Sequence, residues 1–373
     1  MPALPRRPVL VSLVLLLAIL PAAAAEQGVA GVVRCPDGEA VSGLTVRANA
    51  NGTVHEAVTD SGGAFRFAGA LDNGAVLALE GDAGVGRVAL GGGENGALEL
   101  QYPVITEVVL LHDNDQHFDF NFLDTIAAEI EAIREAHPNV FLLNSGDIFV
   151  RHADRWAEPR GAWYLSRALF MIETMNGLRY DAVTAGNHEL DYIGAFTRAA
   201  LDTANFPLLA ANIDVETELL PAFEPYTVLE TAEGYTMAVV GLSVVNFDKP
   251  GVSDRDPAET LQQYAELSGD HDIFAALTHI GVNNDRALAE AVPDLDVILG
   301  GHSHTLLETP ELVNGVLVAQ AGGGGHEVDP DKPMYLGKVT ITLENGTPVE
   351  KSGYVMRFTA DGVEALGELA AAE

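Results

Sequence analysis

The stretch Tyr180-Asp181-Ala182-Val183-Thr184-Ala185-Gly186-Asn187-His188-Glu189-Leu190-Asp191 decides the fold, because a short apolar run breaks at a glycine and is followed by a group of polar side chains. This pattern predicts a buried strand that ends in an active-site loop. The glycine permits a sharp turn or a close approach to a ligand. Asn187, His188 and Asp191 have the chemistry to coordinate a metal, move a proton or orient an imidazole.

The same arrangement recurs at four other places in the chain. Val108 to Leu111 precedes Asp115 and His117, Val140 to Leu143 precedes Asp147, Phe274 to Leu277 precedes His279, and Val297 to Leu299 precedes His302 and His304. Carboxylate oxygen and imidazole nitrogen suit divalent metals, and two such ions about 3.5 to 4 Å apart can share a carboxylate. The sequence therefore predicts five strand ends that converge on a metal site.

Helical patterns alternate with these strands and favour an α/β layered fold. From Phe122 to Ala136, three isoleucines repeat at helical spacing and predict one apolar stripe that packs on a sheet. A second helix is expected from about Trp163 to Met175, with Gly177 as its cap. The closing stretch, residues 361–373, is short, polar and alanine-rich, and we expect a tail that frays.

The first 25 residues have the three parts of a secretory signal peptide. Arg6 and Arg7 precede an apolar stretch from Val9 to Leu20, and small residues follow at 22–25. The alternative is a membrane anchor, but the apolar stretch is too short to span a bilayer, and no later run is long enough. We expect an exported protein, periplasmic or extracellular, that begins near Glu26; the general secretory route is favoured over the twin-arginine route.

The chain is strongly acidic, with 20 basic and 54 acidic residues and a net charge of −34, and removal of Arg6 and Arg7 makes it more negative. This charge argues against nucleic acid polymers and anionic membranes as partners, because both are bound mainly through Lys and Arg. A small phosphate ester is still compatible if a metal supplies local positive charge. The acidity fits either a salty exterior or ordinary solubility. Cys35 is the only cysteine, which excludes an intramolecular disulfide.

Residues 26–102 read as a small all-β domain, with short strands separated by turns rich in Gly, Asp and Asn. Thr59-Asp60-Ser61-Gly62-Gly63-Ala64-Phe65-Arg66-Phe67 resembles the signature of carboxypeptidase-regulatory-like domains, which are immunoglobulin-like sandwiches. No catalytic set is visible here. The resemblance implies a spacer, or a module that binds a surface polymer.

The second domain, residues 103–360, resembles the calcineurin-like metallophosphoesterase superfamily, and more closely its exported 5'-nucleotidase branch. The motifs that carry the resemblance are Leu111-His112-Asp113-Asn114-Asp115-Gln116-His117, Gly186-Asn187-His188-Glu189-Leu190-Asp191, Thr278-His279-Ile280-Gly281 and Gly301-His302-Ser303-His304. The likeness covers about residues 105 to 345 and implies a four-layer αββα sandwich with its site at the strand ends. It does not extend to the base-gripping domain of two-domain 5'-nucleotidases, so nucleotide specificity is not implied.

The resemblance also implies roles for individual residues. Asp115, His117 and His304 would hold one divalent metal, Asn187, His279 and His302 the other, and Asp147 would bridge them. His188 would act as a general acid or charge stabiliser oriented by Asp191, while a metal-bridging hydroxide attacks phosphorus. Zinc or manganese is expected, with iron, magnesium and calcium as alternatives. His112 and Asn114 are expected to support the loop by hydrogen bonding.

Three functions fit these residues. The leading hypothesis is an exported dinuclear-metal phosphohydrolase acting on small phosphomonoesters, with 5'-nucleotides among its candidate substrates. The second is a phosphodiesterase that uses the same site. The third is a secreted binding protein in which the metal site is structural. The sequence does not indicate the oligomeric state.

Overall fold

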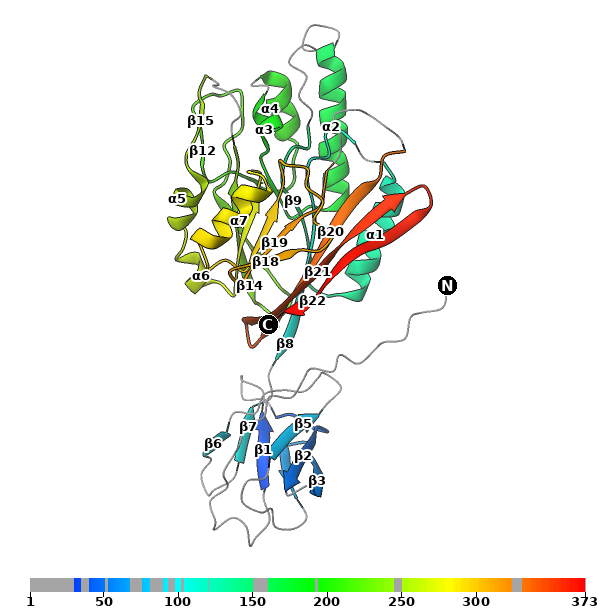
Figure 1. The fold of residues 1–373 in the computed structure, drawn as a ribbon, viewed down its shortest axis with the longest axis vertical. Helices are drawn as coiled ribbons and strands as arrows, with labels where there is room; N and C mark the ends of the chain where they lie inside the picture. Colours follow the sequence, from blue (N-terminus) through cyan, green and yellow to red (C-terminus); the bar gives the residue numbers. More distant parts are fainter. Residues whose placement is uncertain are drawn as a thin grey trace. The chain divides into compact units, whose positions relative to one another are not determined.

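The computed structural model describes residues 30–34, 40–50, 53–67, 76–80, 90–92, 98–101, 104–119, 121–149, 160–191, 194–244, 250–323 and 331–372. The expected signal peptide, residues 1–25, lies outside these ranges. The chain divides into two compact units, Met1–Ile105 and Thr106–Glu373, both drawn in Figure 1.

The first unit is built from short strands. They are β1 (Ala30–Arg34), β2 (Thr45–Ala50), β3 (Thr53–Val58), β4 (Ala64–Arg66), β5 (Val76–Glu80), β6 (Leu90–Gly92) and β7 (Leu98–Gln101). They form two sheets, with strand orders β4-β1-β7-β6 and β3-β2-β5. The Asp60 carboxylate closes the expected turn, because it accepts hydrogen bonds from the backbone N–H groups of Gly62 and Ala64. Two small sheets agree with an all-β domain, while its immunoglobulin-like character stays a prediction.

The second unit begins with elements that alternate between strand and helix. They are β8 (Ile105–Asp113), α1 (Leu123–Ala136), β9 (Val140–Asn144), α2 (Arg160–Leu178), β10 (Ala182–Thr184), α3 (Asn187–Asp191), α4 (Ala195–Leu201), β11 (Leu208–Leu209), β12 (Ile213–Val215), β13 (Tyr226–Glu230) and β14 (Thr236–Leu242). The remaining elements are β15 (Val252–Asp254), α5 (Pro257–Gln262), α6 (Leu267–Asp270), β16 (Ile273–Thr278), α7 (Val282–Ala291), β17 (Val297–Gly300), β18 (Glu311–Val313), β19 (Val316–Gln320), β20 (Met334–Glu344), β21 (Thr347–Thr359) and β22 (Gly362–Ala372).

Two large mixed sheets organise this unit. One has seven strands in the order β11-β10-β9-β8-β20-β21-β22, and the other has six in the order β13-β14-β16-β17-β19-β18. Strands β8, β9, β10 and the edge strand β11 pair in parallel, as do β14, β16, β17 and β19. Parallel strands end on the same edge of a sheet, so the loops that follow them are brought together.

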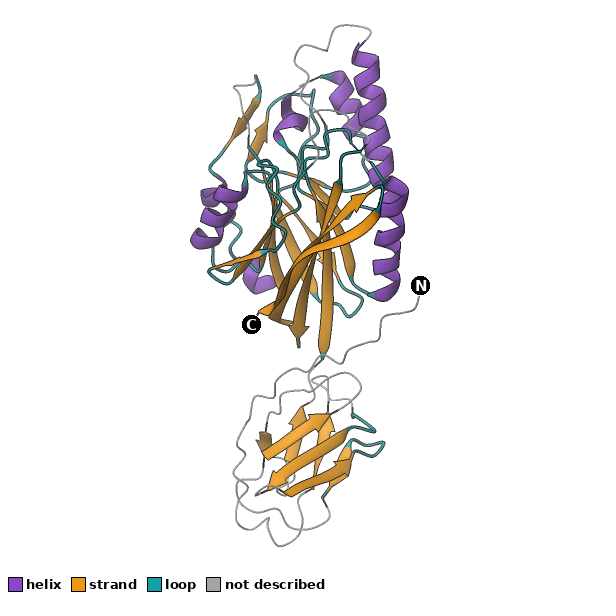
Figure 2. Cartoon of the chain, turned by 45° about the vertical axis from the view of Figure 1, so that its right-hand side comes forward, coloured by secondary structure: helices purple, strands orange, loops and turns teal. Residues whose placement is uncertain are grey.

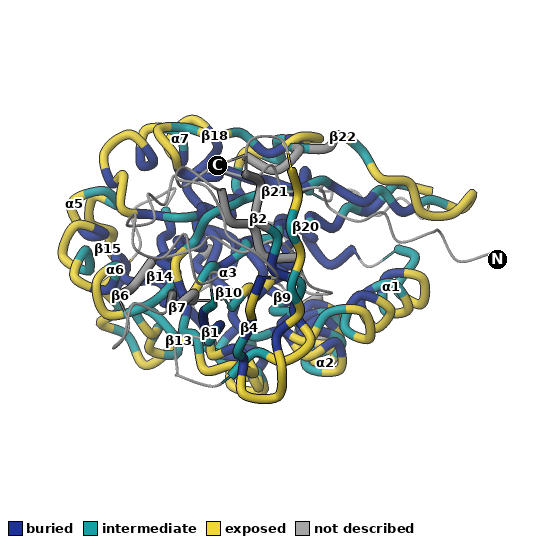
Figure 3. Tube along the Cα trace, turned by 90° about the horizontal axis from the view of Figure 1, so that it is seen from below, coloured by how far each residue is buried: buried dark blue, intermediate teal, exposed yellow. Residues whose placement is uncertain are grey.

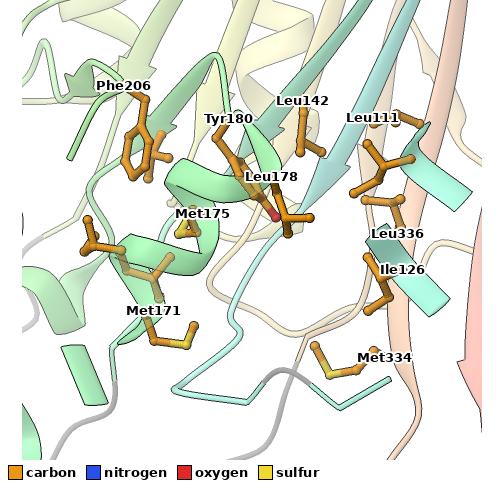
Figure 4. Close-up of a cluster of buried hydrophobic side chains, with 14 of the residues drawn as sticks. Leu111, Ile126, Leu142, Met171, Met175, Leu178, Tyr180, Phe206, Met334 and Leu336 are labelled. Carbon is orange, nitrogen blue, oxygen red and sulfur yellow. The ribbon is translucent and has the colours of Figure 1, made fainter. Parts of the chain in front are cut away.

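The central parallel strands of each sheet are buried on both faces, which explains their continuous apolar runs. Along β8, Val109 and Leu111 belong to the core cluster beneath α1 and α2, while Val108 and Leu110 belong to the cluster between the sheets. Figure 4 shows part of the core cluster beneath α1 and α2, in which Ile126 of α1 and Met171 of α2 lie with sheet residues such as Leu111. Each fully buried residue of this size contributes about 1.5–3 kcal/mol of transfer free energy.

A third core cluster lies between the six-stranded sheet and the helices on its outer side, with Ala238, Phe274 and Leu288 among its members. The order of layers is therefore helices, sheet, sheet, helices, which confirms the predicted αββα sandwich. Figure 2 shows helices on either side of the strands, and Figure 3 shows buried segments inside and exposed segments around the outline. The predicted helix α1 is confirmed with Ile126, Ile130 and Ile133 as its buried stripe.

Two expectations were wrong. Gly177 does not cap α2 but lies within it, and the helix ends at Leu178, followed by Arg179 with a left-handed φ of 60°. The stretch after Asp361 is not a fraying tail, because Gly362–Ala372 forms β22 and pairs antiparallel with β21. Pairing with the adjacent strand of the hairpin outweighs the low strand propensity of this alanine-rich segment.

Among the residues that the structure describes, none of the helices combines the length and the apolar character that a membrane span requires.

Candidate metal centre

The predicted site residues follow five parallel strands of the two facing sheets. Asp115 and His117 follow β8, Asp147 follows β9, Asn187 begins α3 after β10, His279 follows β16, and His302 and His304 follow β17. The first three strands belong to the seven-stranded sheet and the last two to the six-stranded sheet. The core between the sheets holds these strand ends next to one another. All seven residues lie close together.

Asp115, His117 and His304 form what we term the first cluster. One ligand-type atom from each of them lies within 4.8 Å of the others. The Nε2 atoms of His117 and His304 are 3.1 Å apart, and Asp115 Oδ1 lies 3.2 Å from His304 Nε2. The His304 side chain is 31% exposed, whereas the other two are fully buried. This cluster therefore meets solvent at His304.

Asp147, His279 and His302 form the second cluster, with the same convergence of ligand-type atoms. His279 Nε2 lies 3.2 Å from Asp147 Oδ2. Asn187 joins this cluster, because its Oδ1 lies 2.8 Å from His302 Nδ1 and 3.3 Å from His279 Nε2. The membership matches the grouping that the sequence resemblance implies.

Asp147 takes part in more than one grouping. Besides the second cluster, it converges with His117 and His188 in a further set of ligand-type atoms. Since His117 belongs to the first cluster, Asp147 is the carboxylate that lies between the two clusters. Its Oδ1 accepts a hydrogen bond of 2.8 Å from the backbone N–H of His188.

Positive backbone φ angles are concentrated at these positions. The left-handed residues among the predicted ligands are Asp115 (53°), His117 (52°), Asp147 (57°), His302 (76°) and His304 (50°). Side chains rarely tolerate this conformation, and each instance costs on the order of 1–3 kcal/mol. The rest of the fold must supply that free energy, and strain of this kind gathers at functional sites.

Two glycines allow the supporting loops to touch. A Cβ atom on Gly186 would lie 2.2 Å from the backbone nitrogen of Asp147, and one on Gly146 would lie 2.6 Å from the backbone nitrogen of Gly186. Neither distance is sterically possible. The loops after β9 and β10 are therefore packed backbone against backbone, which is why glycine stands at both positions.

Each cluster contains one buried imidazole held by a backbone carbonyl. His117 Nδ1 donates to the Phe149 carbonyl at 2.9 Å, and His279 Nδ1 donates to the Ser145 carbonyl at 2.6 Å. A carbonyl oxygen only accepts, so each Nδ1 carries the proton and each Nε2 faces the cluster. This arrangement is typical of histidine ligands, whose second nitrogen is fixed by a hydrogen bond.

Protonation differs between the two imidazoles. Burial lowers the pKa of His117 to about 4, despite the opposing charges of Asp147 and Asp115. Burial also lowers the pKa of His279, but the carboxylates of Asp147 and Asp115 outweigh it and raise the pKa to about 10. Burial raises the pKa of Asp147, yet the charge of His279 and the neighbouring imidazoles hold it below its usual range. His279 and Asp147 therefore form a buried ion pair in the metal-free protein.

The donor set fits divalent cations. Asp115 Oδ1 is buried and accepts no hydrogen bond from any described residue. A buried carboxylate oxygen without a donor calls for an ion or a water molecule. The carboxylates, imidazoles and amide oxygen around it suit borderline metals such as zinc and manganese. That these residues bind metal stays a prediction.

His188 lies at the edge of both clusters. Its ring contacts that of His117 edge to face, with centroids 5.0 Å apart, and its Nε2 lies 3.6 Å from Asp147 Oδ2. Asp191 is the last residue of α3, and its side chain lies outside the described part of the structure. The predicted orientation of His188 by Asp191 therefore stays untested.

The residues around the two clusters differ in whether they support the loops by hydrogen bonding. Asn114 holds the first cluster as expected, because its Nδ2 donates to Asp115 Oδ2 and to the Gly322 carbonyl, both at 2.6 Å. For His112 the expectation was wrong: Nδ1 is buried without a hydrogen-bond partner among the described residues, and the ring packs against Gly337. Sequence reasoning gave no role to Glu189, which accepts hydrogen bonds from both loops of the centre. The signal available in the sequence was the position of Glu189, an acidic residue within a motif that is otherwise buried.

Comparison with known proteins agrees with this geometry. Residues 109–306 match the calcineurin-like phosphoesterase family. The uncharacterized metallophosphoesterase YunD of Bacillus subtilis is 32% identical over 249 residues, which cover 63% of this chain and 50% of that protein. A 5'-nucleotidase of Vibrio cholerae is 30% identical over 296 residues, covering 64% of this chain and 49% of that protein. The chain thus spans about half the length of these relatives.

A solved structure extends the likeness to the fold. The crystal structure of a 5'-nucleotidase precursor from Thermus thermophilus superposes with a TM-score of 0.55 and 26% identity. The superposition covers 67% of this chain and 54% of that one.

Proposed function

This chain belongs to the calcineurin-like phosphoesterase family, and from that premise we propose that it hydrolyses small phosphomonoesters at a dinuclear metal centre. Nucleotides are candidate substrates, because the names of several relatives describe nucleotidases. The single observation that carries the proposal is the position of Asp147 between the two clusters. A shared carboxylate is the requirement for two ions about 3.5–4 Å apart.

The proposal assigns the two clusters to two divalent ions. Asp115, His117 and His304 would hold one ion, Asn187, His279 and His302 the other, and Asp147 would bridge them. Ions bound there would supply positive charge to a phosphoryl group and would lower the pKa of a coordinated water. The chain itself supplies the orientation of the ligands, through the carbonyls that fix His117 and His279.

His188 is proposed as the proton donor to the leaving oxygen. Its Nε2 faces the Asp147 carboxylate from outside the second cluster, and its ring contacts His117 of the first. His188 reaches both clusters but belongs to neither predicted ligand set, which is the position that a proton donor to the leaving oxygen requires. Asp191 would orient the imidazole from the end of α3.

The test starts from metal removal. We expect chelated protein to lose turnover of a phosphomonoester such as p-nitrophenyl phosphate, and zinc or manganese to restore it. Parallel rates on AMP and on bis(p-nitrophenyl) phosphate separate a monoesterase from a diesterase. Turnover that survives complete metal removal, or that no metal restores, would contradict the proposal.

His188→Ala distinguishes an enzyme from a binding protein with a structural metal site. We expect kcat to fall by about 10²–10⁴-fold with metal content unchanged. His271→Ala is the matched control, because His271 bonds to Thr236 Oγ1 at the opposite end of β16 and should leave kcat unchanged.

We also propose that the protein is exported to the periplasm or the exterior, on the basis of residues 1–25. The first unit would then serve as a spacer or bind a surface polymer. N-terminal sequencing of protein recovered outside the cytoplasm should find a start near Glu26. A chain that keeps Arg6 and Arg7 and stays in the cytoplasm would contradict export.

A further inference from the structure

Glu189 is a fully buried carboxylate that accepts three backbone hydrogen bonds. Its Oε2 accepts from the N–H groups of Asp147 at 2.9 Å and Gly186 at 2.7 Å, and its Oε1 accepts from the N–H of Phe149 at 2.9 Å. This one side chain therefore fixes the backbone at Asp147, at Phe149 and at Gly186, the residue before Asn187.

The three backbone N–H groups that donate to Glu189 belong to residues that are part of the clusters, adjoin them or contact them. The N–H of Asp147 belongs to the carboxylate that lies between the clusters, and Gly186 directly precedes Asn187 of the second. Phe149 uses its N–H on Glu189 and its carbonyl on His117 of the first cluster. Glu189 thus links the loops after β9 and β10 through their main chains, and Phe149 connects them to the His117 side chain of the loop after β8.

The backbone at Asp147 needs such support. Its φ of 57° is unfavourable for an aspartate, and the loop leaves no room for a side chain at Gly186. Without an acceptor at Glu189, the N–H groups of Asp147 and Phe149 would be buried without partners. Each unsatisfied group costs about 1–3 kcal/mol, enough to favour a different loop conformation.

We propose that Glu189 is the positioning residue that makes Asp147 a shared ligand of the two metal sites. It touches neither metal nor substrate, and acts by holding the Asp147 carboxylate at the distance from both clusters that bridging requires. This inference rests on the proposed dinuclear centre.

The test uses Glu189→Gln, which keeps the size of the side chain but places an amide NH2 against backbone donors. Manganese is added to chelated protein, and the bound metal is counted and examined by electron paramagnetic resonance. We expect wild-type protein to bind two Mn²⁺ with the exchange-coupled spectrum of bridged ions. In Glu189→Gln we expect an affinity about 10–100-fold lower, and the spectrum of isolated Mn²⁺.

Asp181→Asn is the matched control. Asp181 is a partly buried carboxylate that, like Glu189, accepts a backbone hydrogen bond, in its case from Leu142, but it lies before β10 and not after it. The control should keep both ions and their coupling. A general loss of stability would affect both variants, whereas loss of positioning affects only Glu189→Gln.

Two outcomes separate the inference from its premise. Wild-type protein with fewer than two coupled ions would overturn the dinuclear centre itself. Two coupled ions in wild type and an unchanged spectrum in Glu189→Gln would overturn only the role of Glu189. If circular dichroism shows that Glu189→Gln does not fold, Glu189→Asp decides in its place, because it keeps the charge but withdraws the carboxylate by one methylene. An unchanged coupled spectrum in Glu189→Asp also overturns the role.

Discussion

The two clusters contain similar ligands and differ in how those ligands are held without metal. Each contains one buried imidazole bonded to a backbone carbonyl, and each contains one partly exposed imidazole from the loop after β17. In the first cluster, His117 is kept neutral by burial and Asp115 Oδ1 has no donor among the described residues. In the second, His279 is protonated and paired with Asp147. Similar side chains therefore give a neutral buried imidazole in one cluster and a protonated buried imidazole, paired with a carboxylate, in the other.

Removal of the Asp147 carboxylate should impair metal binding at both clusters. We expect Asp147→Ala to lose both ions at stoichiometric metal and to lose at least about 10³-fold in kcat/KM, because two cations each stabilise the transition state by several kcal/mol. Metal analysis with steady-state kinetics measures both. A variant that keeps one ion in each cluster would show that Asp147 is not shared.

In the metal-free protein, truncation of one imidazole from each cluster should lower the free energy of unfolding by different amounts. His279→Ala leaves the Asp147 charge buried without its partner, so we expect the free energy of unfolding to fall by about 3–5 kcal/mol. His304→Ala removes a partly exposed side chain and should cost no more than about 1 kcal/mol. Urea unfolding in chelator measures both. Equal losses would contradict the buried ion pair.

A change outside the ligand sets should weaken the first cluster alone. Asn114→Ala removes the donor to Asp115 Oδ2 and the link to Gly322, so we expect metal affinity at the first cluster to fall by about 10–100-fold. The second cluster should keep its affinity, because Asn114 makes no bond to it that the structure describes. Titration calorimetry with two resolved binding steps reports each cluster. A loss at both steps would mean that the clusters bind as one.

Metal binding should also differ between the clusters by the release of one proton. The pKa of His279 is raised to about 10, so the stabilisation from its pairing with Asp147 is fully present below about pH 6.5 and is lost as pH rises through 10. At pH 7 metal binding at the second cluster must release this proton, whereas His117 has none to release. Affinity at the second cluster should therefore rise about tenfold per pH unit up to pH 10. Calorimetry in buffers of different ionisation enthalpy counts the proton.

The sequence predicted those parts of the molecule that local patterns determine. Five apolar runs, each followed by Asp, Asn or His, were enough to indicate the strands and the predicted ligands, because parallel strands end at one edge. The isoleucine stripe of α1 was equally visible, since its spacing is that of a helix.

Features that depend on contacts outside the segment itself could not be predicted. β22 has little strand propensity and forms because β21 lies beside it. α2 passes through Gly177 and ends at Leu178, where Arg134 of α1 donates hydrogen bonds to the carbonyls of Leu178 and Arg179. The role of Glu189 required the knowledge that Asp147, Phe149 and Gly186 all direct their N–H groups at one point.

Each cluster takes its side chains from both sheets: Asp115 and Asp147 follow strands of one, His304 and His279 strands of the other. Cations bound there would cross-link the two layers, so any loosening of the interface between them must release metal, and the release must loosen the interface in turn. Protein that lacks the ions would then be degraded faster as well as being inactive, because proteases cut the opened form.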